Sequence, residues 1–397
     1  MRTVDAAGLR IGDGQPPRIM GVLNVSSESP YDPSVYDDPG EAAAYVDETL
    51  VGEGADIVDV GLESANKRLD VLSPEQELDR LDVAVETIES VSGDAVFSIE
   101  TRYATVAAEA LDRGFDMVND ICGFADPAMP DVCREYDVAV CKMASPPDLQ
   151  RPGAVDDVDW ASARSSSWAD RAGYVDMVYE ALGQNGLTEK TIVDPAFGGW
   201  SENKTLEDDR ETFRRLREFR GFGQPIVVSI NRKNFLRSIA DRSTEEALAV
   251  SLAATSMAVE RGAHVIRTHD VAETRDAALV GGTFSQQTTV TVSGVTATEL
   301  DVRHASELAR HLGRIGADGE AADGFVGRVV EVDGLDADET REFAETAEAA
   351  GAVVCCGTDG LVVGGSATAL AETAASLGST GRFEAVETVL TEPSGGD

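Results

Sequence analysis

Eight short apolar runs, separated by longer amphipathic segments, limit the folds open to this 397-residue chain more than any other feature. Several runs are rich in Val and Ile, which is typical of buried strands. The intervening segments carry helix signals: residues 73–76 (SPEQ) supply an N-cap, a first-turn proline and a capping-box glutamine. A further helix is predicted over 243–262, capped by Ser243 or Thr244 and ended by Gly262. The predicted strands span residues 18–25, 55–61, 95–101, 116–120, 138–143, 191–195, 225–230 and 264–269.

Eight strands joined by helical crossovers predict an α/β fold, a (β/α)8 TIM barrel over residues 1–284. A doubly wound open sheet is the alternative, but neither GxGxxG nor GxxxxGK[ST] follows a predicted strand. The pattern changes after residue 284, since residues 285–397 contain no lysine and few aromatic residues. This region is predicted to form a small, acidic C-terminal α/β domain whose role the sequence leaves open.

The charge balance excludes several classes of partner. There are 72 acidic and 33 basic residues, a net charge of −39, which repels nucleic acid and anionic membranes. Such a surface, with only five lysines, predicts a halophilic, archaeal host whose salt screens the self-repulsion. The N-terminus lacks the apolar region of a signal peptide, no apolar run reaches 18 residues, and the five cysteines show no metal-ligand spacing. We therefore expect a cytoplasmic protein with reduced thiols.

Polar and charged side chains occur at the carboxyl end of every predicted strand, where TIM barrels carry their chemistry. A single residue of this kind more often caps a helix or faces solvent. A complete set favours a binding site instead, and Lys233 stands out because lysine is so scarce in this chain. The set comprises Asn24, Asp59 with Glu63, Glu100, Asn119, Lys142, Asp194, Arg232 with Lys233, and Arg267 with His269.

These residue types suggest two neighbouring pockets. Two carboxylates, an amide and an ammonium group match a flat heterocycle that presents adjacent N–H, amino, ring-nitrogen and carbonyl groups, such as a pterin or guanine edge. Arg267 and His269, together with an amide and a bound cation, suit a phosphorylated group. The residues alone therefore predict a heterocycle pocket beside an anion pocket.

Several of these residues lie in motifs that resemble the dihydropteroate synthase family in order and spacing. The resemblance covers roughly residues 17–284 and implies a barrel that joins 6-hydroxymethyl-7,8-dihydropterin diphosphate to 4-aminobenzoate, or a related arylamine, with release of diphosphate. It also implies Mg²⁺ as cofactor, and a homodimer is a further expectation. The motifs are IMGVLNVSSESPYD, GADIVDVGLES, SIETRYATVAAEAL, MVNDICG, VDPAFGGW, INRKNF and GAHVIRTHDVAET.

The resemblance assigns roles to individual positions. Asn24 matches the asparagine that helps to position magnesium and diphosphate. Asn119, Asp194 and Lys233 match ligands of the pterin edge. Arg232 matches a residue close to the aminobenzoate. Arg267 and His269 match the diphosphate clamp and, with Lys233, form the expected catalytic set.

The sequence departs from the family pattern at several positions. Glu100 stands where the family has aspartate, so this substrate ligand is one methylene longer, and Asn234, a further expected substrate contact, replaces a serine. The first loop reads Ser-Ser-Glu-Ser-Pro (26–30) in place of Thr-Pro-Asp-Ser-Phe, and Ala65 and Asn66 replace a Thr-Arg pair in the second. The segment CKMAS (141–145) lacks the family's Met-His-Met. The pterin half is thus retained, whereas the half that receives the amine is altered.

Two other functions fit parts of the pattern. A pterin-dependent methyltransferase would use the same barrel with a corrinoid protein, but it would not need the Arg267/His269 clamp, and the chain has no Asp-x-His-x-x-Gly corrinoid motif. A non-catalytic pterin-binding protein would explain the altered loops but not the intact clamp. Lys233 could alternatively act as a Schiff-base nucleophile, although its neighbours favour hydrogen bonding.

Overall fold

The structure is a computed structural model of two compact units, Met1–Glu299 and Leu300–Asp397, each of which is considered by itself. The altered segments at 27–30 and 65–66 lie outside the described residues. The structure describes residues 1–26, 34–64, 69–146, 149–150, 152–198, 201, 203–284, 289–292, 295–358, 360–377 and 383–391.

Eight parallel strands form the centre of the first unit, as the alternating sequence predicts. Their order in the sheet is β8-β7-β6-β5-β4-β3-β10-β9. A parallel bridge between Val193 and Ile226, with a 2.9 Å hydrogen bond from Val193 N to the Pro225 carbonyl, joins the two ends of this sheet. The barrel prediction is confirmed over the doubly wound alternative. The strands are β3 (Arg18–Asn24), β4 (Ile57–Gly61), β5 (Val96–Glu100), β6 (Met117–Asp120), β7 (Ala139–Met143), β8 (Thr191–Asp194), β9 (Val227–Val228) and β10 (Val265–Thr268).

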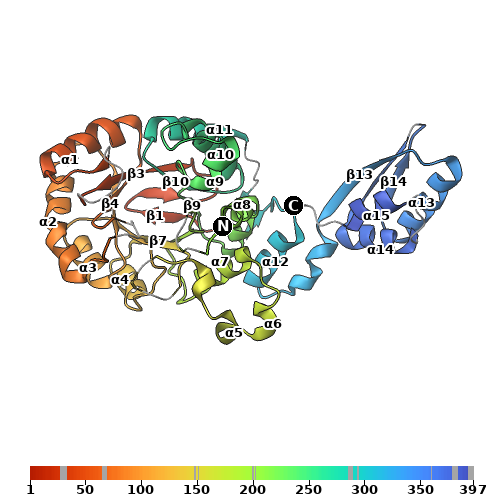
Figure 1. The fold of residues 1–397 in the computed structure, drawn as a ribbon, viewed down its shortest axis with the longest axis horizontal. Coiled ribbons are helices and arrows are strands. Elements are labelled where there is room, and N and C mark those ends of the chain that lie inside the picture. The colour runs from red at the N-terminus through yellow and green to blue at the C-terminus, as the bar shows by residue number, and fades with distance from the viewer. Residues whose placement is uncertain are drawn as a thin grey trace. The chain divides into compact units, whose positions relative to one another are not determined.

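Helices lie outside these strands (Figure 1). Ser73 and Gln76 form the predicted capping box at the start of α2. The predicted start of α10 was wrong: residues 244–246 form a separate turn, and two of its carbonyls accept hydrogen bonds from Arg232 instead of from helical amides. The helices are α1 (Pro39–Tyr45), continued by the π-helical turn η2 (Val46–Val51), α2 (Pro74–Ser90), α3 (Ala104–Asp112), α4 (Met129–Glu135), α5 (Trp160–Ala163), α6 (Ser166–Ala169), α7 (Tyr174–Gly183), α8 (Leu206–Arg214), α9 (Asn234–Ala240), α10 (Leu248–Glu260) and α11 (Val271–Phe284), with 3-10 turns η3 (Val155–Asp157) and η4 (Leu216–Phe222).

A short antiparallel hairpin, β1 (Val4–Ala6) and β2 (Leu9–Ile11), was not predicted from the sequence. Its turn uses Ala7 and Gly8, both with positive φ, which suits a tight two-residue hairpin. The buried side chains of the hairpin pack with the first inward-facing residues of the barrel strands, including Met20 and Ile57. This apolar cluster closes the end of the barrel opposite the predicted site.

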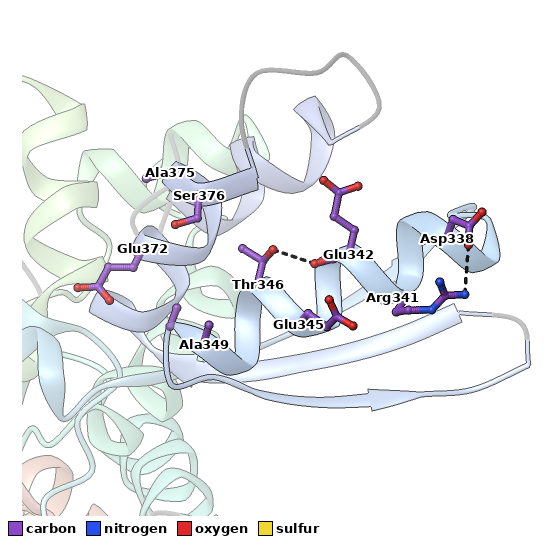
Figure 2. A pocket seen from close by; sticks show the side chains of 10 residues that line it. Asp338, Arg341, Glu342, Glu345, Thr346, Ala349, Glu372, Ala375 and Ser376 are labelled. Carbon is purple, nitrogen blue, oxygen red and sulfur yellow. Dashed lines mark hydrogen bonds and ion pairs between the residues drawn. The ribbon is translucent and has the colours of Figure 1, made fainter.

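The second unit is built on a three-stranded antiparallel sheet in the order β13-β15-β14. Its core includes Phe343 of α13 and Leu370 of α14, both fully buried. An open groove of about 750 Å³, rich in carboxylates, is lined by residues of α13 and α14 (Figure 2) and contains none of the predicted site residues. The elements after the barrel are β11 (Thr289–Val292), β12 (Val295–Thr298), α12 (Ala305–Arg314), η5 (Gly319–Gly324), β13 (Gly327–Asp333), α13 (Ala337–Ala349), β14 (Val353–Cys356), β15 (Gly360–Ser366), α14 (Ala367–Leu377) and α15 (Glu384–Thr391).

None of the helices in the described part of the chain combines the length and the apolar character needed to cross a bilayer.

Candidate functional site

Strand alternation places one set of side chains inside the barrel and the other against the helices. Val58 and Val60, for example, belong to the large core that the helices cover, whereas Ile57 belongs to the apolar cluster inside the barrel. Asp59, two residues further along the same strand, lies on the same side as Ile57 and is fully buried. The barrel interior is therefore apolar at one end and becomes polar toward the carboxyl ends of the strands.

Four strands contribute to a hydrogen-bonded network in this polar part. Asn119 Nδ2 donates to Asp59 Oδ2 at 2.8 Å, and Arg267 Nε donates to the same oxygen at 2.8 Å. Arg267 Nη2 donates to Glu100 Oε2 at 2.6 Å. Three of the predicted site residues, Glu100, Asn119 and Arg267, are thus brought together around Asp59.

Asp59 was recognised as a strand-end residue but not included among the predicted substrate ligands. Its Oδ2 atom accepts two hydrogen bonds, whereas its buried Oδ1 has no hydrogen-bond partner among the described residues. Ser98 pairs with Asp59 in the sheet register, and its buried hydroxyl likewise has no hydrogen-bond partner among the described residues. The period-two pattern of β4 was the signal that Asp59 faces inward.

The charges in the network depend on one another. Burial opposes the charge on Arg267, but Asp59 and Glu100 together raise its pKa above the ordinary value. Burial raises the pKa of Glu100, and the nearby Asp59 adds to this, while Arg267 opposes it. Arg267 is therefore a permanent cation held between two carboxylates.

Asp194 and Lys233 form the other side of the site. Asp194 Oδ1 accepts a 2.7 Å hydrogen bond from Ala196 N, and burial raises the pKa of this carboxyl group. Burial, followed by the positive charge of Arg267, lowers the pKa of Lys233 to about 8. A methyl group added at Gly198 would lie 3.0 Å from Lys233 Nζ, so the turn after β8 packs directly on the ammonium group.

His269 lies at the end of β10, beside this network. Burial, followed by the charge of Arg267, lowers its pKa to about 3. The imidazole is therefore neutral near pH 7, and it would act on a bound anion as a hydrogen-bond donor rather than as a second cation.

The guanidinium group of Arg232 forms hydrogen bonds to other groups of the chain. Its Nε and Nη2 donate to the two oxygens of Asp270 at 2.8 and 2.9 Å, and its Nη1 donates to the carbonyl of Thr244 at 2.7 Å. Asn234 is exposed on α9 and accepts a 3.0 Å hydrogen bond from Arg237. The structure therefore joins Arg232 to the end of β10 and leaves Asn234 at the surface.

Lys142 does not belong to the site. It follows the inward-facing Cys141 and points outward, where its ammonium group donates to the carbonyls of Leu182, Gln184 and Gly186. This lysine satisfies carbonyls at and beyond the end of α7.

Asn24 was predicted to contact a metal ion. Its Nδ2 donates to Ser34 Oγ at 3.0 Å, and its Oδ1 would lie 3.0 Å from a methyl group placed on Gly61. No three His, Cys, Asp or Glu side chains among the described residues converge as a metal site. A single amide oxygen is compatible with Mg²⁺, because this ion usually binds one or two protein oxygens and completes its coordination shell with substrate phosphates and water.

Arg102 connects two loops beside the site and was not singled out from the sequence. Its guanidinium forms an ion pair with Glu63 after β4 and donates to the Gln150 carbonyl, after β7, at 2.8 Å. Glu63 in turn accepts a 3.0 Å hydrogen bond from Leu72 N. The contact joins residues far apart in sequence, so no local pattern could have indicated it.

Glu77, close to Arg102, provides a prediction for the pH dependence of stability. It is buried, its Oε2 accepts a 2.5 Å hydrogen bond from Thr101, and burial raises its pKa from 4.5 to about 7. The folded chain keeps a proton here that the unfolded chain loses, so stability falls by about 2–3 kcal/mol as pH rises from about 4.5 to 7. Glu77→Gln should remove this loss and stabilise the fold at pH 8, as measured by urea unfolding in molar KCl.

The exposed Glu86 on the same helix supplies the control. Glu86→Gln should leave the pH dependence of the wild-type chain in place. An equal pH dependence in Glu77→Gln and the wild type would show that Glu77 is already ionised in the folded chain.

Comparison with known proteins agrees with this geometry. The chain matches the family described as "Pterin binding enzyme" over residues 20–269. It is 33% identical over 261 residues to a probable bifunctional folylpolyglutamate synthase/dihydropteroate synthase of Halobacterium salinarum, covering 66% of this chain but only 31% of that protein. It is 30% identical to the dihydropteroate synthase of Bacillus subtilis, covering 64% of this chain and 83% of the relative. The chain thus spans about a third of the haloarchaeal relative and most of the bacterial one.

Solved structures give the same result. A dihydropteroate synthase from Coxiella burnetii in complex with pteroic acid superposes with a TM-score of 0.56 at 28% identity, covering 71% of this chain and 98% of that one. The Xanthomonas albilineans dihydropteroate synthase with 4-aminobenzoic acid gives a TM-score of 0.56 at 27% identity, covering 71% and 97%.

Proposed function

The chain belongs to the pterin binding enzyme family, and from this premise we propose that it is a dihydropteroate synthase-type transferase of folate biosynthesis. It joins 6-hydroxymethyl-7,8-dihydropterin diphosphate to an arylamine, 4-aminobenzoate or a relative, and releases diphosphate. The observation that carries this proposal is the buried network in which Asn119, Asp59, Arg267 and Glu100 meet beside Asp194 and Lys233.

We assign the pterin to this network. Asp194 accepts the amino and ring N–H groups, the Lys233 ammonium donates to the carbonyl side, and Asn119 binds the remaining edge. The buried Oδ1 of Asp59, which no described residue donates to, is a further acceptor for a ligand N–H group, because a buried acceptor without a donor is unfavourable. Glu100 contributes through Arg267, which it holds in place.

We assign the diphosphate to Arg267 and His269 at the end of β10. Arg267 supplies a permanent charge, and the neutral His269 supplies a directed N–H group. Asn24 Oδ1, with diphosphate oxygens, would hold Mg²⁺. When bound, this ion would neutralise charge that develops on the leaving group.

The reaction then requires positioning more than proton transfer. The amine nitrogen attacks the methylene carbon of the pterin while the carbon–oxygen bond to diphosphate breaks, and the bonding electrons leave with diphosphate. The amine loses one proton to solvent after bond formation. Arg267 and His269 stabilise the departing charge, and the pterin ligands keep the methylene carbon in line with the amine.

The second-substrate loops carry a separate prediction. Ala65 and Asn66, outside the described residues, replace a threonine and an arginine of the family pattern. We expect Ala65→Thr/Asn66→Arg to lower the KM for 4-aminobenzoate and to leave pterin affinity nearly unchanged, because a hydroxyl and a cation are added only on the amine side. Steady-state kinetics with each substrate varied in turn would measure this, and an equal change in both would place the loop against the pterin.

A homodimer is part of the proposal. Helices α10 and α11 pack on each other and carry three exposed apolar side chains that a partner chain could cover: Met257 is 46%, Val280 53% and Phe284 75% exposed. Sedimentation in molar KCl should give the mass of two chains, and Val280→Asp should give that of one. A monomeric wild type would remove this part of the proposal.

A diphosphate-release assay with a panel of arylamines tests the activity. In molar KCl with Mg²⁺ and the pterin diphosphate, release should require both the chain and an arylamine. Pterin binding without release for any arylamine would favour a non-catalytic pterin-binding protein, and methyl transfer from a methylated pterin to a corrinoid would favour a methyltransferase.

A further inference from the structure

The turn that follows β8 is held in an unfavourable backbone conformation. Ala196 has φ +64°, a left-handed value that costs a residue with a Cβ atom roughly 1–2 kcal/mol. This same residue donates its N–H to Asp194 Oδ1 at 2.7 Å. Two residues later, Gly198 packs against Lys233 Nζ. The conformation of this one turn therefore affects both Asp194 and Lys233.

A buried ion pair fixes the turn from the other side. Lys204 Nζ donates to the Ala196 carbonyl at 2.6 Å and lies 2.7 Å from Asp209 Oδ1, and the two side chains are only 1% and 5% exposed. Asp209 Oδ1 also accepts a 3.1 Å hydrogen bond from Gly198 N. The pair thus binds one backbone group at each of the two positions that contact the site.

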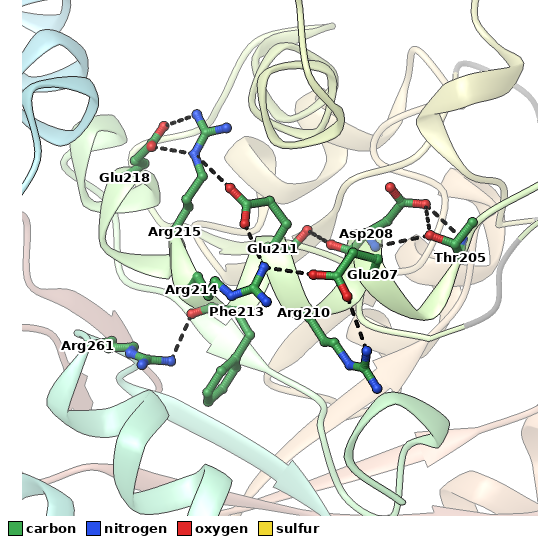
Figure 3. Close-up of polar contacts among 11 residues, drawn as sticks. Thr205, Glu207, Asp208, Arg210, Glu211, Phe213, Arg214, Arg215, Glu218 and Arg261 are labelled. Atoms are coloured by element: carbon green, nitrogen blue, oxygen red, sulfur yellow. Dashed lines mark hydrogen bonds and ion pairs between the residues drawn. The ribbon is translucent and has the colours of Figure 1, made fainter. Parts of the chain in front are cut away.

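Helix α8 anchors this pair. Thr205, next to Lys204, forms a capping box with Asp208: Thr205 N donates to Asp208 Oδ2 at 2.7 Å, and Asp208 N donates to Thr205 Oγ1 at 3.2 Å (Figure 3). Further along the helix, Arg214 bonds to both Glu207 and Glu211 at 2.7 and 3.0 Å. The start of α8, which Lys204 precedes and which carries Asp209, is therefore well defined.

We infer that Lys204 and Asp209 are positioning residues that hold Ala196 in its left-handed conformation and thereby orient Asp194 and Lys233 toward the pterin. This inference rests on the proposed function of the same site. It places a second lysine, after Lys233, beside the site in a chain that has only five. Neither residue contacts the ligand; both act through the turn.

The test compares binding of the pterin diphosphate, with Mg²⁺ in molar KCl, to the wild type and to Lys204→Met/Asp209→Asn. Removing both charges avoids a lone buried ion, and the new asparagine can still accept from Gly198 N. Because Ala196 is then free to relax, we expect affinity to fall about tenfold. Ala196→Gly in the same background should restore most of this loss, because glycine adopts positive φ readily.

Lys190→Met is the matched control, since Lys190 also bonds a carbonyl and a carboxylate, those of Asp137, but precedes β8 at its other end. Its affinity should equal that of the wild type. If the double variant does not fold, Lys204→Gln/Asp209→Asn with and without Ala196→Gly gives the same comparison without leaving a lone buried charge.

Unchanged affinity in a folded Lys204→Met/Asp209→Asn variant would overturn the inference. A loss that Ala196→Gly does not restore would also overturn it, since the pair would then act through its charges and not through the turn. A wild-type chain that binds no pterin diphosphate would contradict the proposed function instead.

Discussion

Replacing Arg267 with methionine should weaken binding of the pterin diphosphate by roughly 10- to 100-fold and binding of the pterin alcohol far less. The guanidinium carries a permanent charge, and a charge-assisted contact with an anion contributes roughly 1.5–3 kcal/mol. Only the diphosphate ligand can use that contact. Calorimetry with both ligands in molar KCl measures the difference.

This substitution also removes the partner of two buried carboxylates. Breaking a buried ion pair destabilises a protein by about 3–5 kcal/mol, and Asp59 and Glu100 would both lose their bond to Arg267. The double variant Glu100→Gln/Arg267→Met also removes one of the two carboxylate charges and so relieves part of this destabilisation. The effect of Arg267 on binding is therefore measured by comparing this double variant with Glu100→Gln alone.

Arg113, in a surface pair with Asp82, supplies the control: Arg113→Met should cost less than about 1 kcal/mol of stability and no affinity. Equal losses of affinity for the diphosphate and the alcohol in the Arg267 variant would make Arg267 a structural residue.

Dilute buffer should unfold the chain, and molar KCl should restore it. With a net charge of −39, the folded chain carries strong self-repulsion, and the Debye length falls from about 30 Å at 0.01 M salt to about 3 Å at 1 M. We expect screening to add a few kcal/mol of stability, so a cooperative melting transition should appear in molar KCl and be absent in dilute buffer.

Sucrose is uncharged, so it cannot screen charge, but it is excluded from the protein surface and favours compact states in that way. It therefore distinguishes charge screening from this general effect of excluded solutes. Sucrose alone should not refold the chain in dilute buffer. Equal melting temperatures at low and high salt would show that the acidic surface has no bearing on folding.

Much of the barrel could be predicted because its signals are local. Each strand is a short run with its own flanking helix signals, and parallel strands joined by helices leave few topologies. The N-terminal hairpin was missed because its strands are three residues long and its packing partners, such as Ile57 and Val265, are distant in sequence. The start of α10 was misplaced because Arg232, outside the segment, binds the carbonyls of the preceding turn.

The same division applies to the site. Strand-end position identified Glu100, Asn119, Asp194 and Arg267, but position alone does not say whether a side chain points inward. Lys142 and Asp59 were therefore both candidates. In the structure Lys142 faces α7, whereas Asp59 lies inside the barrel.

Long-range contacts could not be predicted at all. The bond from Arg102 to Gln150 and the pair formed by Lys204 and Asp209 become visible only when the loops are placed in space.

Identification of the product tests the proposed activity most directly. The full chain, in molar KCl with Mg²⁺, 4-aminobenzoate and 6-hydroxymethyl-7,8-dihydropterin diphosphate, should yield 7,8-dihydropteroate, detected by mass spectrometry. Asp194→Asn should lower the yield by about 100-fold or more, because the proposed acceptor of two pterin N–H groups would become partly a donor. Absence of the condensed product from the wild-type chain with every arylamine tested, while the pterin diphosphate remains bound, would contradict the proposed synthase activity.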